Sequence, residues 1–306
     1  MQNRDIILAL AAVALWSTVA TAFKLGLSLF SPLQLVTLSV TIATLFFLVL
    51  SLTTGRLDPK PLKKMRASGA LGRSMGLGLL NPLLYYLILF IAYDLLPAQI
   101  AQPVNYTWSI TLALLAIPLL GQRLTRKHLL AILLSYLGVL VIVIPAGSSQ
   151  GADGQAISWF GVFLALFSTL IWAGYWLLNA RDSGEPITMM TISFLTATPI
   201  LLVACYLIDD WPALTGRGFA YALWAGLAEM GLGFLFWQLA LRATDRAALL
   251  GQLIFLAPFV SLVLIHHVLG EPVAATSVIG LGIIVVGLVW SARLPAAGKP
   301  RASDFS

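Results

Sequence analysis

Two uncharged, apolar stretches decide the fold: PLQLVTLSVTIATLFFLVLS at residues 32–51 and PITMMTISFLTATPILLVAC at residues 186–205. A helix of about 20 such residues crosses the hydrocarbon core of a bilayer, which is about 30 Å thick. Charged residues divide the chain into ten windows of this kind: 6–23, 25–55, 74–93, 95–122, 128–152, 154–180, 186–208, 218–241, 247–270 and 272–292. We therefore predict an all-α integral membrane protein with ten transmembrane helices.

The composition excludes an ordinary soluble domain. Of the 306 residues, 59% are hydrophobic and 10% are charged, and the mean hydropathy is +0.94. Because the windows begin at residue 6, we expect the first apolar segment to remain as a span rather than to be cleaved as a signal peptide. Cys205 is the one cysteine, so neither an intramolecular disulfide nor a thiolate metal cluster is expected. We expect no cofactor and no metal.

The basic residues predict the orientation of the chain. With a cytoplasmic N-terminus, sixteen of the eighteen Lys and Arg residues fall in cytoplasmic segments, and only Lys24 and Arg217 lie at the outer ends. A bias of this kind sets membrane topology, so we predict that both termini are cytoplasmic. We expect the basic segments 55–73 and 121–128 to contact anionic membrane lipids. Nucleic acid is not an expected partner, because no aromatic stacking platform accompanies these charges.

The two quoted stretches also indicate an internal repeat. At a shift of 154 residues, seven of twenty aligned positions are identical. The identical pairs are Pro32 and Pro186, Thr37 and Thr191, Ser39 and Ser193, Ala43 and Ala197, Thr44 and Thr198, Leu48 and Leu202, and Val49 and Val203. Other windows match at shifts between 148 and 156. We therefore predict a first five-helix unit at 1–150, a second at 151–294, and a cytoplasmic tail at 295–306.

An odd number of helices in each unit makes the second unit enter the membrane from the opposite side. The two repeats are then inverted. Inverted repeats are the architecture of many secondary transporters, in which substrate binds near the midplane between the halves. The same topology fits some channels, so a channel or facilitator for small metabolites stays open as the alternative.

Glu229 is the one Asp, Glu, Lys or Arg residue inside a window, with eleven uncharged residues of that window before it and twelve after it. At a shift of 148 its repeat partner is Asn81. Ionised groups at such depth are costly, and they usually face a cavity or a partner. Two roles are open for this pair of positions. Glu229 either carries a proton in step with transport or, as a neutral acid, hydrogen-bonds a neighbouring helix.

Windows four and nine contain the signals of broken helices. Their prolines are Pro97, Pro103, Pro118 and Pro258. Proline removes a backbone donor, and the carbonyl that it frees needs another partner inside a membrane. Asn105 and Ser261 lie close to these prolines in the sequence. Half-helix ends near the midplane can present backbone groups to a small polar ligand, and a simple packing kink is the alternative.

Several aromatic residues lie inside the windows. They are Trp16, Tyr85, Tyr86, Trp172, Tyr175, Trp176 and Trp237. Belts at the membrane surfaces are the usual reason for Trp and Tyr, but Tyr85 lies about midway in its window. Aromatic faces combined with the hydrogen-bonding groups of Asn105, Ser261 and Gln252 suit a flat, amphipathic molecule that is uncharged or zwitterionic. Tyr85, Trp176 and Gln252 are therefore predicted substrate contacts.

Four short motifs resemble the drug/metabolite transporter superfamily with its EamA-type repeats. They are LWST at 15–18, VNYTW at 104–108, IWAGY at 171–175 and GE at 270–271. Within the superfamily, the chain is most similar to the bacterial aromatic amino acid and paraquat exporter branch. The resemblance covers about residues 5–293. It implies ten helices, a central cavity open to alternate sides, a bacterial inner membrane, and export of amino acids, aromatic ones above all, and related amphipathic metabolites.

The resemblance also implies cavity positions. These are Asn105, Tyr106, Trp108, Trp172 and Ser261. The Gly-Glu pair that such exporters have in each repeat is present as Gly270-Glu271 but reads Gly121-Gln122 in the first half. The two halves have therefore diverged. Glu229 is a candidate by its depth and not by the family pattern.

An intramembrane enzyme is the rival class, and the sequence argues against it. Such enzymes need a nucleophile with a basic partner, paired acids, or histidines arranged for zinc. His266 and His267 are adjacent and so face different sides of a helix. We therefore expect a transporter without enzymatic activity. The oligomeric state is open, and a monomer is compatible with the sequence.

Overall fold

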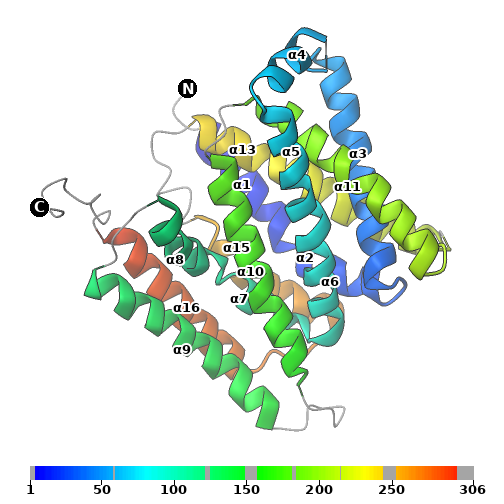
Figure 1. Ribbon diagram of the computed structural model, residues 1–306. Coiled ribbons are helices and arrows are strands. Elements are labelled where there is room, and N and C mark those ends of the chain that lie inside the picture. The colour runs from blue at the N-terminus through cyan, green and yellow to red at the C-terminus, as the bar shows by residue number, and fades with distance from the viewer. Residues whose placement is uncertain are drawn as a thin grey trace, which may run out of the picture.

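The computed structural model describes residues 4–57, 59–120, 125–148, 157–180, 184–213, 215–243 and 253–294, and these residues form helices and no strand (Figure 1). In the first half the elements are α1 (Arg4–Ser17), α2 (Val19–Leu27), α3 (Pro32–Thr53), α4 (Pro59–Ala67), α5 (Ala70–Gly78), η1 (Leu79–Leu84), α6 (Tyr85–Leu95), α7 (Ala98–Asn105), α8 (Trp108–Leu120) and α9 (Arg126–Ser148). In the second half they are α10 (Trp159–Ala180), α11 (Pro186–Ile208), α12 (Gly216–Leu223), η2 (Trp224–Gly233), α13 (Phe234–Ala243), α15 (Leu256–Leu264), η3 (Ile265–Leu269) and α16 (Ala275–Arg293). The elements η2 and η3 are π-helical, and η1 contains a kink at Asn81.

Seven helical stretches in the described part of the chain are long and apolar enough to cross a membrane. They are Arg4–Leu27, Pro32–Thr53, Ala70–Leu95, Arg126–Ile144, Trp159–Asn179, Pro186–Ile208 and Gly216–Ala240. Each corresponds to one of the ten sequence windows. Two further apolar helices, Leu256–Leu269 and Ala275–Ser291, are shorter. The chain is therefore a multi-pass helical membrane protein.

Of the three remaining windows, window ten holds one helix, α16 of 19 residues, whereas windows four and nine contain turns. Window four is divided into α7 and α8 by a turn at Tyr106 and Thr107, three residues after Pro103. In window nine, a turn at Ile254 and Phe255 precedes α15. Pro258 lies in the first turn of α15, where a missing backbone N–H costs no helical hydrogen bond.

Helices α3 and α11 begin with the same kind of N-terminal cap. Ser31, which precedes Pro32, accepts a hydrogen bond from the Gln34 backbone N–H. Glu185, which precedes Pro186, accepts one from the Thr188 backbone N–H. Such caps satisfy backbone donors that the first helical turn leaves without a partner. The cap therefore recurs at the repeat-related position, 154 residues further along the chain.

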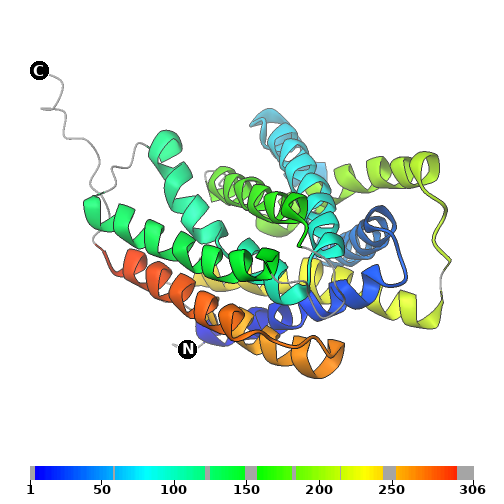
Figure 2. The same ribbon diagram turned by 90° about the horizontal axis from the view of Figure 1, so that it is seen from below.

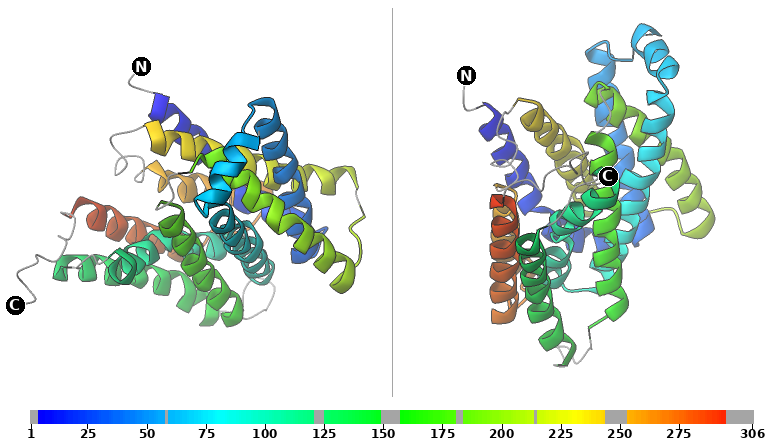
Figure 3. Two further views of the ribbon diagram at one scale, coloured as in Figure 1. Left: turned by 45° about the horizontal axis from the view of Figure 1, so that its top comes forward. Right: turned by 60° about the vertical axis from the view of Figure 1, so that its left-hand side comes forward.

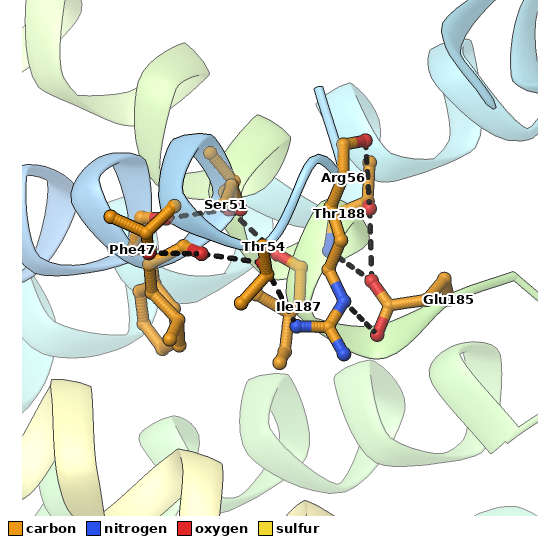
Figure 4. Close-up of polar contacts among 10 residues, drawn as sticks. Phe47, Ser51, Thr54, Arg56, Glu185, Ile187 and Thr188 are labelled. Carbon is orange, nitrogen blue, oxygen red and sulfur yellow. Dashed lines mark hydrogen bonds and ion pairs between the residues drawn. The ribbon is translucent and has the colours of Figure 1, made fainter. Parts of the chain in front are cut away.

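The same two helices pack antiparallel. At one end, Ser31 donates a hydrogen bond to Asp209. At the other end, Arg56 Nε lies 3.1 Å from Glu185 Oε1, and Ser51 hydrogen-bonds Thr191 at 2.6 Å (Figure 4). The Arg56–Glu185 pair is partly exposed, and such pairs contribute about 1 kcal/mol or less.

The contacts between α3 and α11 are also symmetric. Thr44 and Thr198, which are repeat partners, share a hydrogen bond of 2.6 Å. Thr37 Oγ1 donates to the Leu201 carbonyl at 3.4 Å, and Thr191 Oγ1 donates to the Phe47 carbonyl at 3.3 Å. The shift of 154 residues converts one of these last two bonds into the other. Equivalent helices of the two halves therefore meet in equivalent ways.

Helices α9 and α16 form a second close pair beside the rest of the bundle (Figures 1 and 2). A Cβ added to Gly138 would lie 2.5 Å from the Gly280 carbonyl oxygen, and one added to Gly287 would lie 2.1 Å from Ser135 Oγ. Small residues at a helix crossing allow the backbones to approach closely in membranes. The glycines therefore fix the distance between these two helices.

Gly280→Ala is expected to destabilise the protein by about 1–3 kcal/mol, because its new Cβ overpacks the crossing. That Cβ would lie 2.4 Å from Ile142 Cγ1 and 2.6 Å from the Gly138 carbonyl oxygen. Gly282→Ala on the same helix is the control, since nothing lies within 4 Å of its Cβ. Thermal unfolding in detergent, followed by tryptophan fluorescence, measures both variants. Equal melting temperatures for the two variants would contradict the close approach.

Candidate functional site

A small cavity lies among helices from both halves. Its described lining residues are Trp16, Val19, Phe23, Tyr85, Leu89, Tyr93, Gln102, Asn105, Tyr106, Trp108, Trp172, Glu229 and Ile254. Helix α10, which carries Trp172, packs beside α6 and α8 (Figures 1 and 3). The cavity has a volume of about 40 Å³, enough for a few water molecules.

Glu229 places a carboxyl group in the wall of this cavity. The side chain is 8% exposed. Its Oε1 accepts a hydrogen bond of 3.0 Å from the Tyr86 hydroxyl, while Oε2 has no hydrogen-bond partner among the described residues. The Glu229 backbone carbonyl accepts a bond of 3.4 Å from Trp16 Nε1. One carboxyl oxygen therefore has a hydrogen-bond partner in the described part of the chain and the other has none.

Both members of the Glu229 and Asn81 repeat pair lie where the helix departs from regular α geometry. Glu229 lies in η2, a π-helical segment, whereas Asn81 lies at a kink within η1. Segments of π-helix often occur at functional sites. Asn81 has an extended backbone (φ −148°, ψ 119°), the conformation that a following proline such as Pro82 favours. This helix break was not predicted from the sequence.

The aromatic part of the wall centres on Trp172. Its ring centroid lies 4.5 Å from that of Tyr85, 5.4 Å from that of Phe234 and 6.3 Å from that of Trp108. Tyr85 in turn lies 4.9 Å from Tyr86, which binds Glu229. Aromatic pairs at such separations contribute about 0.5–1.5 kcal/mol each beyond their burial. The rings and the carboxyl therefore form one connected wall.

A polar chain continues this wall. The Tyr85 hydroxyl donates to Asn105 Oδ1 at 3.4 Å, and Asn105 Nδ2 donates to Ser168 Oγ at 2.9 Å. Asn105 is the last residue of α7, where the helix break exposes backbone groups that a continuous helix would bond. Gln102, one turn earlier, is buried and its Oε1 makes no hydrogen bond of normal geometry with the described residues.

The structure brings together six of the predicted site residues. Tyr85, Asn105, Tyr106, Trp108, Trp172 and Glu229 all line the cavity. The other four do not join them. Trp176 packs on Trp172 at 5.7 Å, and Ser261 is fully buried in α15, but neither is a described lining residue. Asn81 lies beside the Tyr175 hydroxyl instead. Gln252 lies outside the described residues.

Sequence reasoning missed Gln102 and Tyr93, which also line the cavity. Gln102 precedes Asn105 by three residues, so the two share one face of a helix. That spacing was a usable signal. Tyr93 lies at the end of window three, where an aromatic residue is ordinarily interpreted as part of the belt at the membrane surface. Its sequence position therefore gave no reason to place it at a cavity.

The Gly270-Glu271 pair has a structural place away from the cavity. Glu271 accepts hydrogen bonds from the backbone N–H groups of Ala98 at 3.2 Å and Gln99 at 3.4 Å, at the start of α7. Gly270 has φ +69°, a left-handed conformation that glycine adopts without strain. The motif thus caps α7, the helix that ends at Asn105. In the described part of the chain, no group of three or more His, Cys, Asp or Glu residues is placed to hold a metal ion.

These features define a multi-pass helical membrane protein with a polar and aromatic cavity between its helices. The model of the EamA-like transporter family matches residues 3–144 and again residues 159–293. The chain belongs to this family, and so to the drug/metabolite transporter superfamily.

Similar proteins occur in bacteria and archaea. An uncharacterised transporter of Archaeoglobus fulgidus is 25% identical over 287 residues, which cover 92% of this chain and 96% of the relative. An uncharacterised protein of Pseudomonas aeruginosa is 33% identical over 162 residues, so the match spans about half of each chain, 53% in both cases. A crystal structure with 21% identity aligns over 94% of this chain and 96% of its own, with a TM-score of 0.65. That likeness concerns the fold.

Proposed function

We propose that this protein is a secondary transporter that exports amino acids, aromatic ones above all, and related amphipathic metabolites from the cytoplasm by alternating access. The observation that carries the proposal is the cavity in which Tyr85, Trp172 and Asn105 meet, since it combines ring faces with hydrogen-bonding groups. Pockets of this make-up suit flat molecules with a few polar groups. The proposal includes the aromatic amino acid and paraquat exporter branch of the superfamily.

Alternating access needs two halves that move against each other, and the proposal includes ten spans in two inverted five-helix repeats at 1–150 and 151–294. The symmetric contacts of the antiparallel helices α3 and α11 support it. So does the double match of the family model. A rocking motion about such a symmetric contact opens each side in turn.

The size of the cavity supports a change of conformation during transport. Room for a few water molecules is less than an aromatic amino acid occupies. Binding therefore requires lining rings such as those of Trp108 and Tyr106 to move apart. Both are only half-buried, unlike Trp172, and so have less packing to lose.

The test is counterflow in liposomes that contain only this protein. Unlabelled phenylalanine or tryptophan inside the liposomes should drive accumulation of the labelled amino acid from outside, with a rate that saturates. Rates that rise linearly with concentration, without counterflow, would support the channel alternative. Chemical conversion of the label would support an enzyme instead.

We also propose a bacterial inner membrane location with both termini in the cytoplasm. A cysteine at position 149, introduced as Ser149→Cys with Cys205→Ala, should then react with a membrane-impermeant maleimide in intact cells. The Cys205→Ala chain without the new cysteine is the control for background labelling. Labelling that occurs only after the cells are permeabilised would show the reverse topology.

A further inference from the structure

We infer that the cavity selects its substrate by a positively charged nitrogen, which the Glu229 carboxylate binds, and that its described lining offers no charged partner for a substrate carboxylate. The inference rests on the proposed role of this cavity as the substrate site. It narrows the substrate class to aromatic compounds that carry an ammonium group. The cavity then recognises an amino acid by its ammonium group, and it binds an aromatic amine at least as well.

The first support is the unequal hydrogen bonding of the two Glu229 oxygens. Tyr86 donates to Oε1 at 3.0 Å, whereas Oε2 is buried without a partner among the described residues, in a side chain that belongs to the cavity lining. A carboxyl that serves packing alone normally has both oxygens satisfied when it is buried. The ionised form accepts hydrogen bonds only, so its natural ligand is a donor with positive charge.

The second support is the aromatic character of the cavity wall that Glu229 shares. Trp16, Tyr85 and Trp172 line the cavity together with Glu229. The faces of such rings are electron-rich and attract ammonium groups, and cages of aromatic residues bind them in many proteins. An anion gains nothing from the same faces. The wall therefore favours a cationic group over an anionic one.

The third support is the charge of the described lining, in which Glu229 is the one carboxylic acid and no Lys, Arg or His occurs. Lys24, on the neighbouring helix α2, donates instead to the backbone carbonyls of Tyr93 at 2.8 Å and Leu96 at 3.0 Å. A substrate carboxylate therefore meets neutral donors at best, such as the unbonded Trp172 Nε1. Neutral donors offset less of the desolvation of an anion than a cation does.

Three ligands with the same ring and two-carbon chain test the inference. Phenylethylamine carries the ammonium alone, 3-phenylpropionate the carboxylate alone, and phenylalanine both. Their dissociation constants are measured by isothermal titration calorimetry on the purified full-length protein in detergent at pH 7. Phenylethylamine should bind at least as tightly as phenylalanine, and 3-phenylpropionate about tenfold or more weakly, the range expected for one charged hydrogen bond.

Two variants assign the preference to Glu229. Glu229→Gln should weaken phenylethylamine binding by about tenfold or more and leave 3-phenylpropionate unchanged. Asp210→Asn is the matched control, because it makes the same chemical change on an exposed residue just after α11 and should alter neither ligand. If Glu229→Gln does not fold, the ranking of the three ligands on the unchanged protein decides alone.

Three results would overturn the inference: 3-phenylpropionate binding as tightly as phenylethylamine, no binding of phenylethylamine, or equal affinities in the protein and in Glu229→Gln. The outcomes also separate this inference from the proposed function. Phenylethylamine binding without phenylalanine counterflow in liposomes would reject amino acid export and keep ammonium recognition. Phenylalanine counterflow with no preference for the ammonium ligand would keep amino acid export and reject ammonium recognition.

Discussion

Trp172→Ala is expected to raise the half-saturating concentration for transport of aromatic substrates by about 5- to 150-fold, since stacking and apolar contact with one large ring contribute about 1–3 kcal/mol. Trp172 lies at the centre of the wall, with the Tyr85 ring 4.5 Å away and the Trp108 ring 6.3 Å away. Initial rates of labelled tryptophan or phenylalanine uptake in liposomes measure the effect.

The same substitution also removes packing, so its control must separate folding from binding. Trp172 is 6% exposed and contacts five aromatic rings, and loss of such a side chain costs about 3–5 kcal/mol of stability. Tyr106→Ala is the milder companion, because Tyr106 is half-buried at the helix break. Trp159→Ala on the same helix as Trp172 faces outward and should change nothing. Unaltered uptake by well-folded Trp172→Ala and Tyr106→Ala proteins would remove these residues from the site.

The sequence predicts a membrane protein correctly because burying charge in a bilayer is costly, so membrane-spanning segments contain few charged residues. Seven of the ten windows, six of them uncharged and one with Glu229 as its single charged residue, form long helices for this reason. Helix length within windows four and nine is a different matter. It depends on where a helix breaks, as at Tyr106 and Thr107 in window four and at Ile254 and Phe255 in window nine. Asn81 before Pro82 is a break of the same kind within window three. A count of apolar residues does not contain this information.

The candidate site was predictable to the extent that polarity and depth mark a residue. Glu229 is a buried charge, and Asn105 is a polar residue beside a break, so both were found and both line the cavity. Ser261 has the same features but is enclosed in α15, away from the described lining. The direction of a side chain around its helix decides between these cases. When a membrane helix is apolar on all sides, its sequence does not show which side chains point toward a cavity.

Glu229→Gln is expected to abolish the response of transport to a pH gradient, while exchange between compartments of equal pH continues at saturating substrate. Glutamine has a similar shape and its carbonyl oxygen can still accept the Tyr86 hydrogen bond, but it has no proton to release. The other ionisable groups at the cavity are the phenols of Tyr85, Tyr93 and Tyr106, with Tyr86 beside Glu229, and phenols ordinarily titrate near pH 10. The carboxyl is therefore the described group suited to carry the proton.

The measurement is counterflow in liposomes with and without an imposed pH gradient, for the unchanged protein, for Glu229→Gln and for the exposed control Asp210→Asn. The ammonium preference and the proton role are independent in this design. The first changes the substrate concentration that is needed, and the second changes the dependence on the gradient. If Glu229 only supports the fold, glutamine should serve nearly as well in both respects. Transport by the unchanged protein that ignores the pH gradient would exclude the proton role, and the protein would then be a facilitator driven by the gradient of its substrate.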